Sequence, residues 1–323
     1  AQGALRRVSG MYPFAAYDRD NPRLVAMVRE HMRRPGSAVW FSPYQPVPRA
    51  LAAVPMLRKH VVLHDIIPLR FPDEHPSASY YLEMLRAHQQ RADCIWANSA
   101  FTRAEVLNYF PDMDADTVRV AHLGGGEQFT PAPAEDVAEA RRQCGLPPDA
   151  AFLCCLATLE PRKGLTDAVR AFSALSASLP EMGLHLVLIG QKGWRYTTIL
   201  AAAQEHADRI RLPGFLQDET VRGLLSGCLC FLYPSRYEGF GLPVVEAMAC
   251  GAPVITSNAA SLPEVAGGAA LQVPPGDVAA LVEAMRSVCL DRGLRERLRE
   301  AGPAQAKRFS WARCAETMVQ GML

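Results

Sequence analysis

The chain has 323 residues, of which 49% are hydrophobic and 21% are charged, and its formal net charge is +1. This length suits two domains of ordinary size, each with its own core, and the composition is that of a globular protein. No apolar run approaches the roughly 18 residues that a membrane-spanning helix needs, and we expect no signal peptide.

The first 60 residues are strongly basic. They carry ten Lys and Arg side chains against three Asp and Glu side chains, so they hold a charge of +7 and the remainder of the chain −6. A basic face could lie against anionic lipid headgroups, hold a phosphorylated acceptor, or be an ordinary arginine-rich surface in water. No recognised nucleic-acid-binding module is present, so we expect no nucleic-acid partner.

Strand and helix patterns alternate in the N-terminal part. Helical patterns occur at about 22–34, 77–91 and 101–109, and Ser99 is a suitable N-cap for the last of them. Apolar, strand-like runs occur at 38–41, 61–64, 94–97 and 118–122. This alternation favours a mostly parallel, doubly wound sheet in an α/β domain that covers residues 1–130.

Residues 131–150 separate this domain from a second one. The stretch is rich in Pro and Ala and holds only a short helical pattern, so we expect a linker. The second α/β domain is predicted over residues 151–305, with strands at 152–158, 184–189, 210–212, 229–233 and 253–256. Helices are expected at about 165–178, 194–206, 218–226 and 243–250, and the tail from about residue 277 is helical and amphipathic.

Nine cysteines are scattered along the chain without a Cys-x-x-Cys pair. Several of them, such as Cys154, Cys155 and Cys230, lie inside apolar strand patterns. We therefore expect buried, reduced thiols in a cytoplasmic protein, and neither disulfides nor zinc ligands.

The segment from Tyr233 to Pro253 carries the strongest functional signal. It reads as the end of a buried strand, a turn that contains two glycines, and a helix with Pro243 in its first turn. Free backbone N–H groups and the positive end of the helix dipole meet in such a turn, which suits a phosphate or an anionic sugar nucleotide. Glu238 precedes the glycines, and Glu246 lies one turn into the helix, on the side that faces the turn.

This spacing of Glu238 and Glu246 closely resembles the Glu-x7-Glu signature of retaining glycosyltransferases of the GT-B fold, family GT4. Four further segments look like consecutive blocks of that family, in its order and roughly its spacing: 155–164, 186–194, 211–228 and 261–277. The resemblance implies two Rossmann-like domains that face a cleft, and a C-terminal helix, 306–323, that returns to the first domain. It also implies transfer of a hexose, with retention of configuration, from a nucleotide-sugar to a hydroxyl acceptor.

One departure from the family concerns the amino terminus. Family members open with a strand and a Gly-rich loop that helps to frame the acceptor and the donor phosphates, and residues 1–20 match neither. Either the sequence lacks its first strand–helix unit, or its first domain is a reduced one. The resemblance otherwise covers essentially all of residues 150–290 and, more loosely, 60–130.

The chemistry of a sugar-nucleotide donor predicts where cations are needed. Departure of a diphosphate builds negative charge, so cationic side chains and N–H dipoles should converge on it. Arg162 and Lys163 follow a strand end, where α/β sheets place ligands, and are the predicted catalytic cations. Lys192 follows another strand end and could reach either phosphate or solvent. No cluster of metal-ligand type is apparent, and we expect neither a metal ion nor a bound cofactor.

The resemblance assigns roles to the residues of the motif. Glu246 is expected to accept hydrogen bonds from the two ribose hydroxyls, which suits a carboxylate because it accepts two donors at once. Glu238 is expected to act as a catalytic residue beside the transferred sugar. The backbone amides of Phe240, Gly241 and Leu242 are expected to hold sugar hydroxyls.

Further site residues lie outside the motif. The resemblance makes His64, at the end of a strand, the acceptor-side catalytic histidine, with Asp65 either orienting it or capping the next turn. Contacts to the base are expected from Gly214, Phe215 and Leu216. Glu264 either helps to close the phosphate loop or pairs with a neighbouring cation.

We therefore expect a cytoplasmic hexosyltransferase, free or peripheral on the inner face of the membrane. Its donor would carry mannose or glucose on GDP or UDP, with GDP-mannose first, and its hydroxyl acceptor would be free or lipid-linked, in surface-polysaccharide or glycoconjugate synthesis. Two alternatives remain: a non-catalytic nucleotide-sugar-binding protein, and another GT-B enzyme such as a nucleotide-sugar epimerase. A dinucleotide site at Gly124-Gly125-Gly126 is not expected, because no Gly-x-Gly-x-x-Gly follows a strand there.

Overall fold

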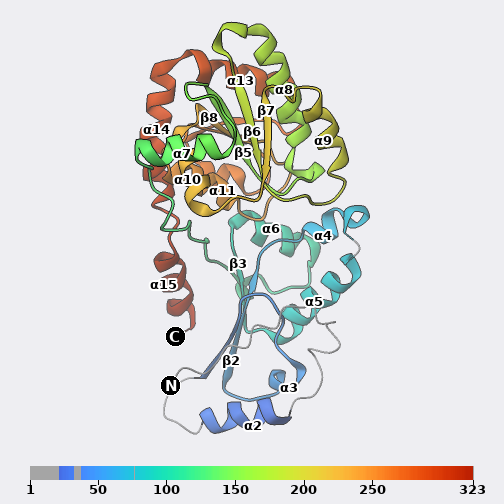
Figure 1. Cartoon of the computed structure of the whole chain (residues 1–323). Coiled ribbons are helices and arrows are strands. Elements are labelled where there is room, and N and C mark those ends of the chain that lie inside the picture. The colour runs from blue at the N-terminus through green and yellow to red at the C-terminus, as the bar shows by residue number, and fades with distance from the viewer. Residues whose placement is uncertain (1–21, 33–37, 76, 323) are drawn as a thin grey trace.

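The structure is a computed structural model that describes residues 22–32, 38–75 and 77–322 of the 323-residue chain. It consists of two α/β units, one above the other in Figure 1, and the chain crosses between them twice. The expectation that residues 1–20 lack a first strand falls outside the described residues. So does part of the predicted basic face, namely the arginines before residue 22 and those at positions 33 and 34.

Four parallel strands form the sheet of the N-terminal unit, in the order β1-β2-β3-β4. They span Ala38–Ser42 (β1), Leu57–Leu63 (β2), Cys94–Ala97 (β3) and Val118–Val120 (β4). The helices are α2 (Pro22–His31), α3 (Arg49–Ala52), α4 (Ile67–Arg70), α5 (Ala78–Arg91) and α6 (Ala100–Tyr109), with 3-10 turns at Pro72–Glu74 and Ala115–Thr117. The Ser99 hydroxyl accepts a hydrogen bond from the Thr102 N–H, which confirms Ser99 as the N-cap of α6.

Six parallel strands form the sheet of the C-terminal unit, in the order β10-β9-β8-β5-β6-β7. They span Phe152–Leu156 (β5), His185–Ile189 (β6), Ile210–Gly214 (β7), Cys230–Tyr233 (β8), Val254–Ser257 (β9) and Ala270–Val273 (β10). The strand order reverses between β5 and β8, because strands are added outward from this pair in both directions. In open α/β sheets, ligands bind beyond the carboxyl ends of the strands at such a switch point.

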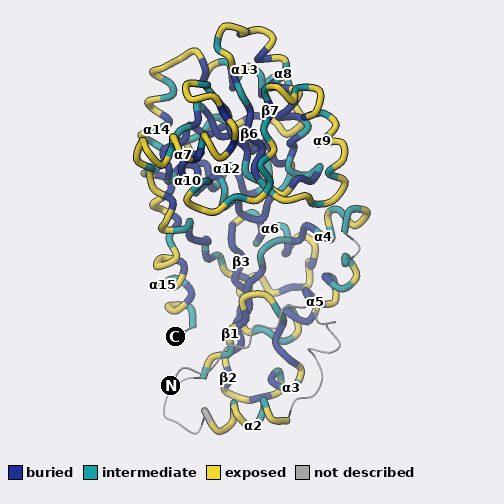
Figure 2. Tube along the Cα trace, viewed as in Figure 1, coloured by how far each residue is buried: buried dark blue, intermediate teal, exposed yellow. Residues whose placement is uncertain are grey.

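Helices cover both faces of the C-terminal sheet (Figure 1). They are α8 (Leu165–Ser178), α9 (Thr197–Gln204), α10 (Asp218–Gly227), α11 (Leu242–Ala249), α12 (Leu262–Ala266), α13 (Val278–Leu290) and α14 (Arg292–Ala306), with 3-10 turns at Pro161–Lys163 and Pro180–Met182. Phe152 and Cys154 belong to the core cluster on one face, and Leu153 and Cys155 to that on the other. Two buried faces explain why β5 is apolar at every position, and Figure 2 shows the buried strands between exposed outer helices.

The structure bears on the state of the cysteines and on the expected lack of a membrane-spanning helix. All nine cysteines are buried and free, which confirms that they are neither paired nor exposed. Burial raises the pKa of several of their thiols, for example to about 11 at Cys144, so they are poor nucleophiles. Within the described part of the chain, no helix is both long and apolar enough to cross a bilayer.

The predicted linker 131–150 belongs to the C-terminal unit. It contains α7 (Ala134–Gln143), which packs along α10, and Ala140 lies in the core of that unit together with Cys144 and Leu146. The contact is close, because a Cβ added at Gly223 of α10 would lie 2.7 Å from the Ala140 side chain. The expectation of a linker was wrong because the alanines in this Pro/Ala-rich stretch serve as small packing residues.

The C-terminal helix α15 (Trp311–Met322) returns to the N-terminal unit. Its Cys314 and Met318 pack with Val62 and Trp96 of the N-terminal sheet, which confirms the predicted return helix. The two connections between the units touch at Gly124, where a Cβ would lie 2.2 Å from the Trp311 backbone nitrogen. The run of three glycines thus permits a close crossing of two chain segments.

Candidate functional site

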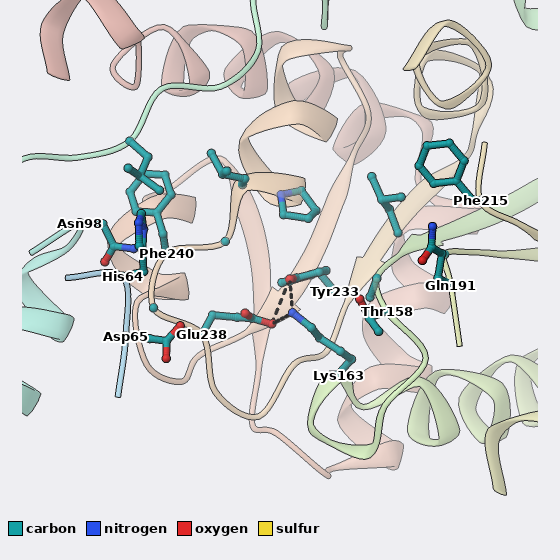
Figure 3. A pocket seen from close by; sticks show the side chains of 18 of the residues that line it. His64, Asp65, Asn98, Thr158, Lys163, Gln191, Phe215, Tyr233, Glu238 and Phe240 are labelled. Carbon is teal, nitrogen blue, oxygen red and sulfur yellow. Dashed lines mark hydrogen bonds and ion pairs between the residues drawn. The ribbon is translucent and has the colours of Figure 1, made fainter. Parts of the chain in front are cut away.

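A cavity of about 560 Å³ lies at the switch point of the C-terminal sheet (Figure 3). Residues that follow β5, β6 and β8 form one wall of the cavity. The opposite wall comes from the N-terminal unit, through His64 and Asp65 after β2 and Asn98 after β3. The cavity is therefore shared by the carboxyl ends of both parallel sheets.

The loop of residues 234–241 joins β8 to α11, and its last four residues contact both units. Gly241 has a φ of 110°, which a residue with a Cβ rarely adopts, and it turns the chain into the helix. The Ser99 hydroxyl of the N-terminal unit donates to the Gly239 carbonyl at 2.7 Å. A Cβ at Gly239 would lie 2.1 Å from the His64 carbonyl oxygen, so a glycine is required where the two units meet.

The amino-terminal end of α11 faces the cavity. Gly241, Leu242 and Pro243 all line it. The first N–H groups of a helix have no acceptor within the helix, and the helix dipole makes this end positive. This end of α11 is therefore suited to an anionic group such as phosphate.

Glu238 is a buried carboxylate with a full set of partners (Figure 3). Its Oε1 accepts hydrogen bonds from Lys163 Nζ at 2.6 Å, the Tyr233 hydroxyl at 2.9 Å and the Ser235 hydroxyl at 2.6 Å. Its Oε2 lies 3.1 Å from a guanidinium nitrogen of Arg162. Burial alone would raise the pKa of Glu238, but the charges of Lys163 and Arg162 hold this pKa below its ordinary value. Glu238 is therefore ionised and carries the charge balance of this wall.

The two predicted cations lie at different depths. Lys163 lines the cavity beside Glu238 and Tyr233, and its Nζ also lies 5.5 Å from the centre of the Tyr233 ring. Arg162 lies behind Glu238, with a side chain only 9% exposed, and is paired with Glu160 and with the Tyr237 carbonyl. Of these two residues, Lys163 belongs to the described lining of the cavity and Arg162 does not. The structure thus separates a cation that faces the cavity from one that supports Glu238.

Glu246 lies in a smaller pocket of about 180 Å³ that adjoins the cavity. The two hollows share Leu156, Gly190 and Phe215 in their walls. Burial, and secondarily the charge of Asp218 in the same pocket, raises the pKa of Glu246 to about 7. Glu246 is therefore poised between its charged and neutral forms near neutral pH.

The residues predicted to contact the base lie around this pocket. Phe215 and Leu216 line it, and Phe215 is 62% exposed, so its ring is available to a ligand. Gly214 has a φ of 78° and its carbonyl accepts the Gly190 N–H at 2.9 Å, so it shapes the loop from behind. Lys192 lines the main cavity, with its Nζ 5.2 Å from the centre of the Tyr196 ring.

His64 and Asp65 lie on the N-terminal wall of the cavity. The Nε2 of His64 lies 2.8 Å from the Pro43 carbonyl oxygen, and its ring stacks on Tyr44. A carbonyl oxygen can only accept, so Nε2 of His64 carries a proton and donates it to this hydrogen bond. The Oδ1 of Asp65 accepts the Ile67 N–H at 2.8 Å, which caps the turn into α4, and burial raises the pKa of Asp65.

Glu264 lies at the junction of the two units and outside the main cavity. Its carboxylate accepts the N–H groups of Ala100 and Phe101 at the start of α6, at 2.9 and 3.3 Å, and lies 2.5 Å from His122 Nε2. Glu264 was expected either to help close the phosphate loop or to pair with a neighbouring cation, and its partners are these two N–H groups and the His122 ring. Glu264 therefore ties the C-terminal unit to α6.

Sequence reasoning missed three polar residues at this site. Tyr233 and Ser235 lie inside the motif and bind the Glu238 carboxylate, and a hydroxyl close in sequence to a buried glutamate was the available signal. Asn98 lines the cavity from the N-terminal unit, and its position directly before the Ser99 N-cap, at a strand end, was the signal there. No group of three or more His, Cys, Asp or Glu side chains lies close enough to hold a metal ion within the described ranges.

Comparisons with known proteins agree on one family. The family model described as glycosyl transferases group 1 matches residues 136–305. O-antigen chain mannosyltransferase B of Escherichia coli is 34% identical over 269 residues, which cover 81% of this chain and 69% of that protein. The serotype-specific mannosyltransferase WbdA of Escherichia coli is 32% identical over 269 residues, which cover 80% of this chain. The match spans only 32% of WbdA, so the chain corresponds to about a third of that protein.

Solved structures agree on the fold. Sucrose-phosphate synthase from Thermosynechococcus elongatus superposes with a TM-score of 0.71 at 24% identity, covering 93% of this chain and 76% of that one. Anabaena Alr3699/HepE, solved in complex with UDP and glucose, gives a TM-score of 0.73 at 19% identity, covering 93% and 81%. These likenesses confirm the expected GT-B arrangement of two Rossmann-like units.

Proposed function

Because the chain belongs to the group 1 glycosyl transferases, we propose that it moves a hexose from a nucleoside diphosphate sugar to a hydroxyl group of a glycan. The observation that carries the proposal is the continuity of the two hollows. A small pocket with Glu246 leads into a larger cavity with Lys163 and the α11 amino terminus, and that cavity ends at His64 on the other unit. This order matches the order of nucleoside, diphosphate and sugar in the donor.

The nucleoside belongs in the pocket of Glu246. An ionised Glu246 accepts hydrogen bonds from the two ribose hydroxyls, and Phe215 and Leu216 supply apolar surface for the base. Asp218 lines the same pocket, and a carboxylate can accept from both the ring N–H and the amino group on the edge of guanine. Uracil presents a single N–H there, so Asp218 supports a GDP-linked donor.

The diphosphate belongs beside Lys163 and the first turn of α11. Both stabilise negative charge as it grows on the leaving diphosphate. Because Lys163 and the amino-terminal end of α11 supply positive charge here, they support the proposal that the reaction needs no divalent metal and no cofactor. Arg162 and Glu238 hold Lys163 in place from behind.

The hexose belongs between Glu238 and His64. The N–H groups of Gly241 and Leu242 are placed for its hydroxyls, and the Glu238 carboxylate is placed to support positive charge that develops at the anomeric carbon. We extend the proposal to retention of configuration, in which the leaving phosphate takes the proton of the acceptor hydroxyl on the same face. Glu238 is held by four side chains, which supports a charge-stabilising role over a role as nucleophile.

The names of the relatives support mannose as the hexose and a surface polysaccharide as the product. We extend the proposal to a lipid-linked acceptor, in which case basic residues of the first 60 positions would lie against an anionic membrane surface.

The test is a product assay with GDP-mannose and octyl α-mannoside, an acceptor that imitates a lipid-linked mannoside. We expect a dimannoside with an α linkage by NMR, release of GDP, and the same rate in the presence of EDTA. Lys163→Met should lower the rate by about 100-fold or more, because one stabilising cation is lost. Lys307→Met, which removes an exposed lysine, is the matched control.

The outcome also separates the alternatives. UDP-glucose is run in parallel, so that a uridine donor is detected if the guanine argument fails. Nucleotide binding without any product would indicate a nucleotide-sugar-binding protein. A changed sugar on the intact nucleotide would indicate an epimerase, and either result would overturn the proposal.

A further inference from the structure

Asn98 lines the cavity and has a buried side-chain oxygen without a hydrogen-bond partner among the described residues. The residue is only 3% exposed and lines the cavity directly. Its side-chain oxygen Oδ1 is buried and accepts no hydrogen bond from any described residue. Leaving a buried amide oxygen unpaired is unfavourable, so such atoms are rare in folded proteins unless a water molecule or a ligand pairs with them.

The backbone around Asn98 is firmly held. Asn98 directly follows β3, and its N–H donates to the Leu63 carbonyl at the end of β2. The next residue, Ser99, caps α6 and donates its hydroxyl to the Gly239 carbonyl across the unit boundary. The Asn98 side chain is therefore presented by a rigid support, as a ligand-binding group requires.

The position of Asn98 indicates which part of a ligand it would meet. In Figure 3, Asn98 and His64 lie at one end of the cavity, and Phe215 and Gln191 lie at the other. The nucleoside pocket adjoins the cavity at Phe215. Asn98 is thus at the end remote from the nucleoside, next to the loop that contains Glu238.

The chemistry of the two walls is complementary to a sugar nucleotide. The C-terminal wall offers donors, namely Lys163 and the N–H groups at the start of α11, which suit phosphate oxygens. The N-terminal wall offers a neutral acceptor, namely Oδ1 of Asn98, which suits a hydroxyl group. A neutral acceptor binds a hydroxyl without adding charge beside the ionised Glu238.

We propose that Asn98 recognises the transferred hexose, and that its buried Oδ1 accepts a hydrogen bond from a hydroxyl group of that sugar. This inference rests on the proposed function and adds to it a residue of the N-terminal unit that selects for the sugar part of the donor. Asn98 neither takes a proton nor touches the nucleotide. Its effect is on the affinity for the sugar and on the placing of the sugar for transfer.

The experiment compares each nucleotide with its sugar-bearing form by titration calorimetry, using GDP with GDP-mannose and UDP with UDP-glucose. For Asn98→Ala we expect an unchanged affinity for the free nucleotide and an affinity about tenfold lower for the nucleotide-sugar. Asn98→Asp keeps an acceptor oxygen and should recover part of the loss. Asn108→Ala, the same change at an exposed position of α6, should alter neither affinity.

A second measurement separates recognition from a structural role. Asn98→Leu replaces an unpaired polar group by an apolar one of similar shape, so the free protein should melt at the same temperature as the wild type or above it. It should nevertheless lose the preference for the nucleotide-sugar. If Asn98→Ala changed the affinities for free nucleotide and nucleotide-sugar equally, or changed neither, the role of Asn98 would be overturned. The proposed function would not be affected by that result. Failure of the wild-type protein to bind both pairs of ligands would overturn the proposed function and this inference with it.

Discussion

Glu238 and Glu246 belong to one short motif, but their surroundings differ in almost every respect. Glu238 is bound by two cations and two hydroxyls, which keep its pKa below the ordinary value. Glu246 is half-buried and close to Asp218, and no described cation offsets these two effects, so its pKa is raised to about 7. The comparison teaches that the same side chain carries permanent charge at one end of the site and an adjustable charge at the other.

The difference has a structural cause. Glu238 lies in the loop between β8 and α11, and its carboxylate pairs with Lys163 and Arg162 of the β5–α8 connection. Glu246 lies inside α11, and the nearby wall comes from α10, whose first residue is acidic. A ligand with hydroxyl donors can therefore pair with Glu246, whereas the hydrogen-bonding capacity of Glu238 is already used by the protein.

The largest effect is expected from neutralising Glu238. Glu238→Gln leaves Lys163 and Arg162 without their shared counter-charge in a buried place, so the free energy of unfolding should fall by about 3 kcal/mol. Transfer should fall by at least about 100-fold, because Lys163 is no longer held at the cavity wall. Urea unfolding and the product assay measure the two effects, with Glu219→Gln on the exposed surface of α10 as control. Wild-type stability in Glu238→Gln would break the distinction between the two glutamates.

A smaller effect is expected in the pH dependence of stability. Glu246 has a folded-state pKa above its unfolded value, so the folded protein binds more protons than the unfolded chain between about pH 4.5 and pH 7. Its contribution to stability is present below this window and is lost as pH rises through it, by about 2 kcal/mol between pH 5 and pH 7. Urea unfolding at several pH values should show this slope in the wild type and lack it in Glu246→Gln. Identical slopes would show that Glu246 keeps an ordinary pKa.

The sequence predicted much of the fold because the strands have distinctive patterns. A strand buried on both faces, such as β5, is a short apolar run, and it was located correctly. The short strand β10 and the helix α12 were not predicted, since both contain few residues and β10 is only partly buried. The helix α7 was placed in a linker because its packing partner α10 lies far along the chain.

The site could be predicted as a set of positions, but its electrostatics could not. Arg162 and Lys163 are neighbours in the sequence and were therefore given the same expected role. Only the folded structure shows that Lys163 faces the cavity and that Arg162 lies behind Glu238. Glu264 was expected either to help close the phosphate loop or to pair with a neighbouring cation, and the structure shows it binding the start of α6 in the other unit. Such pairings connect residues more than 60 positions apart, so no local pattern reports them.

The most direct test of this account measures the affinity for an intact donor as Glu246 changes its charge. GDP-mannose suits this purpose, with UDP-glucose in parallel, because its phosphates do not change protonation near neutral pH. Since hydroxyl donors prefer an ionised acceptor, the wild-type affinity should rise by about tenfold between pH 6 and pH 8. Glu246→Gln should bind weakly at both pH values. Equal affinities for the two proteins at both pH values would contradict the assignment of the nucleoside to the pocket of Glu246.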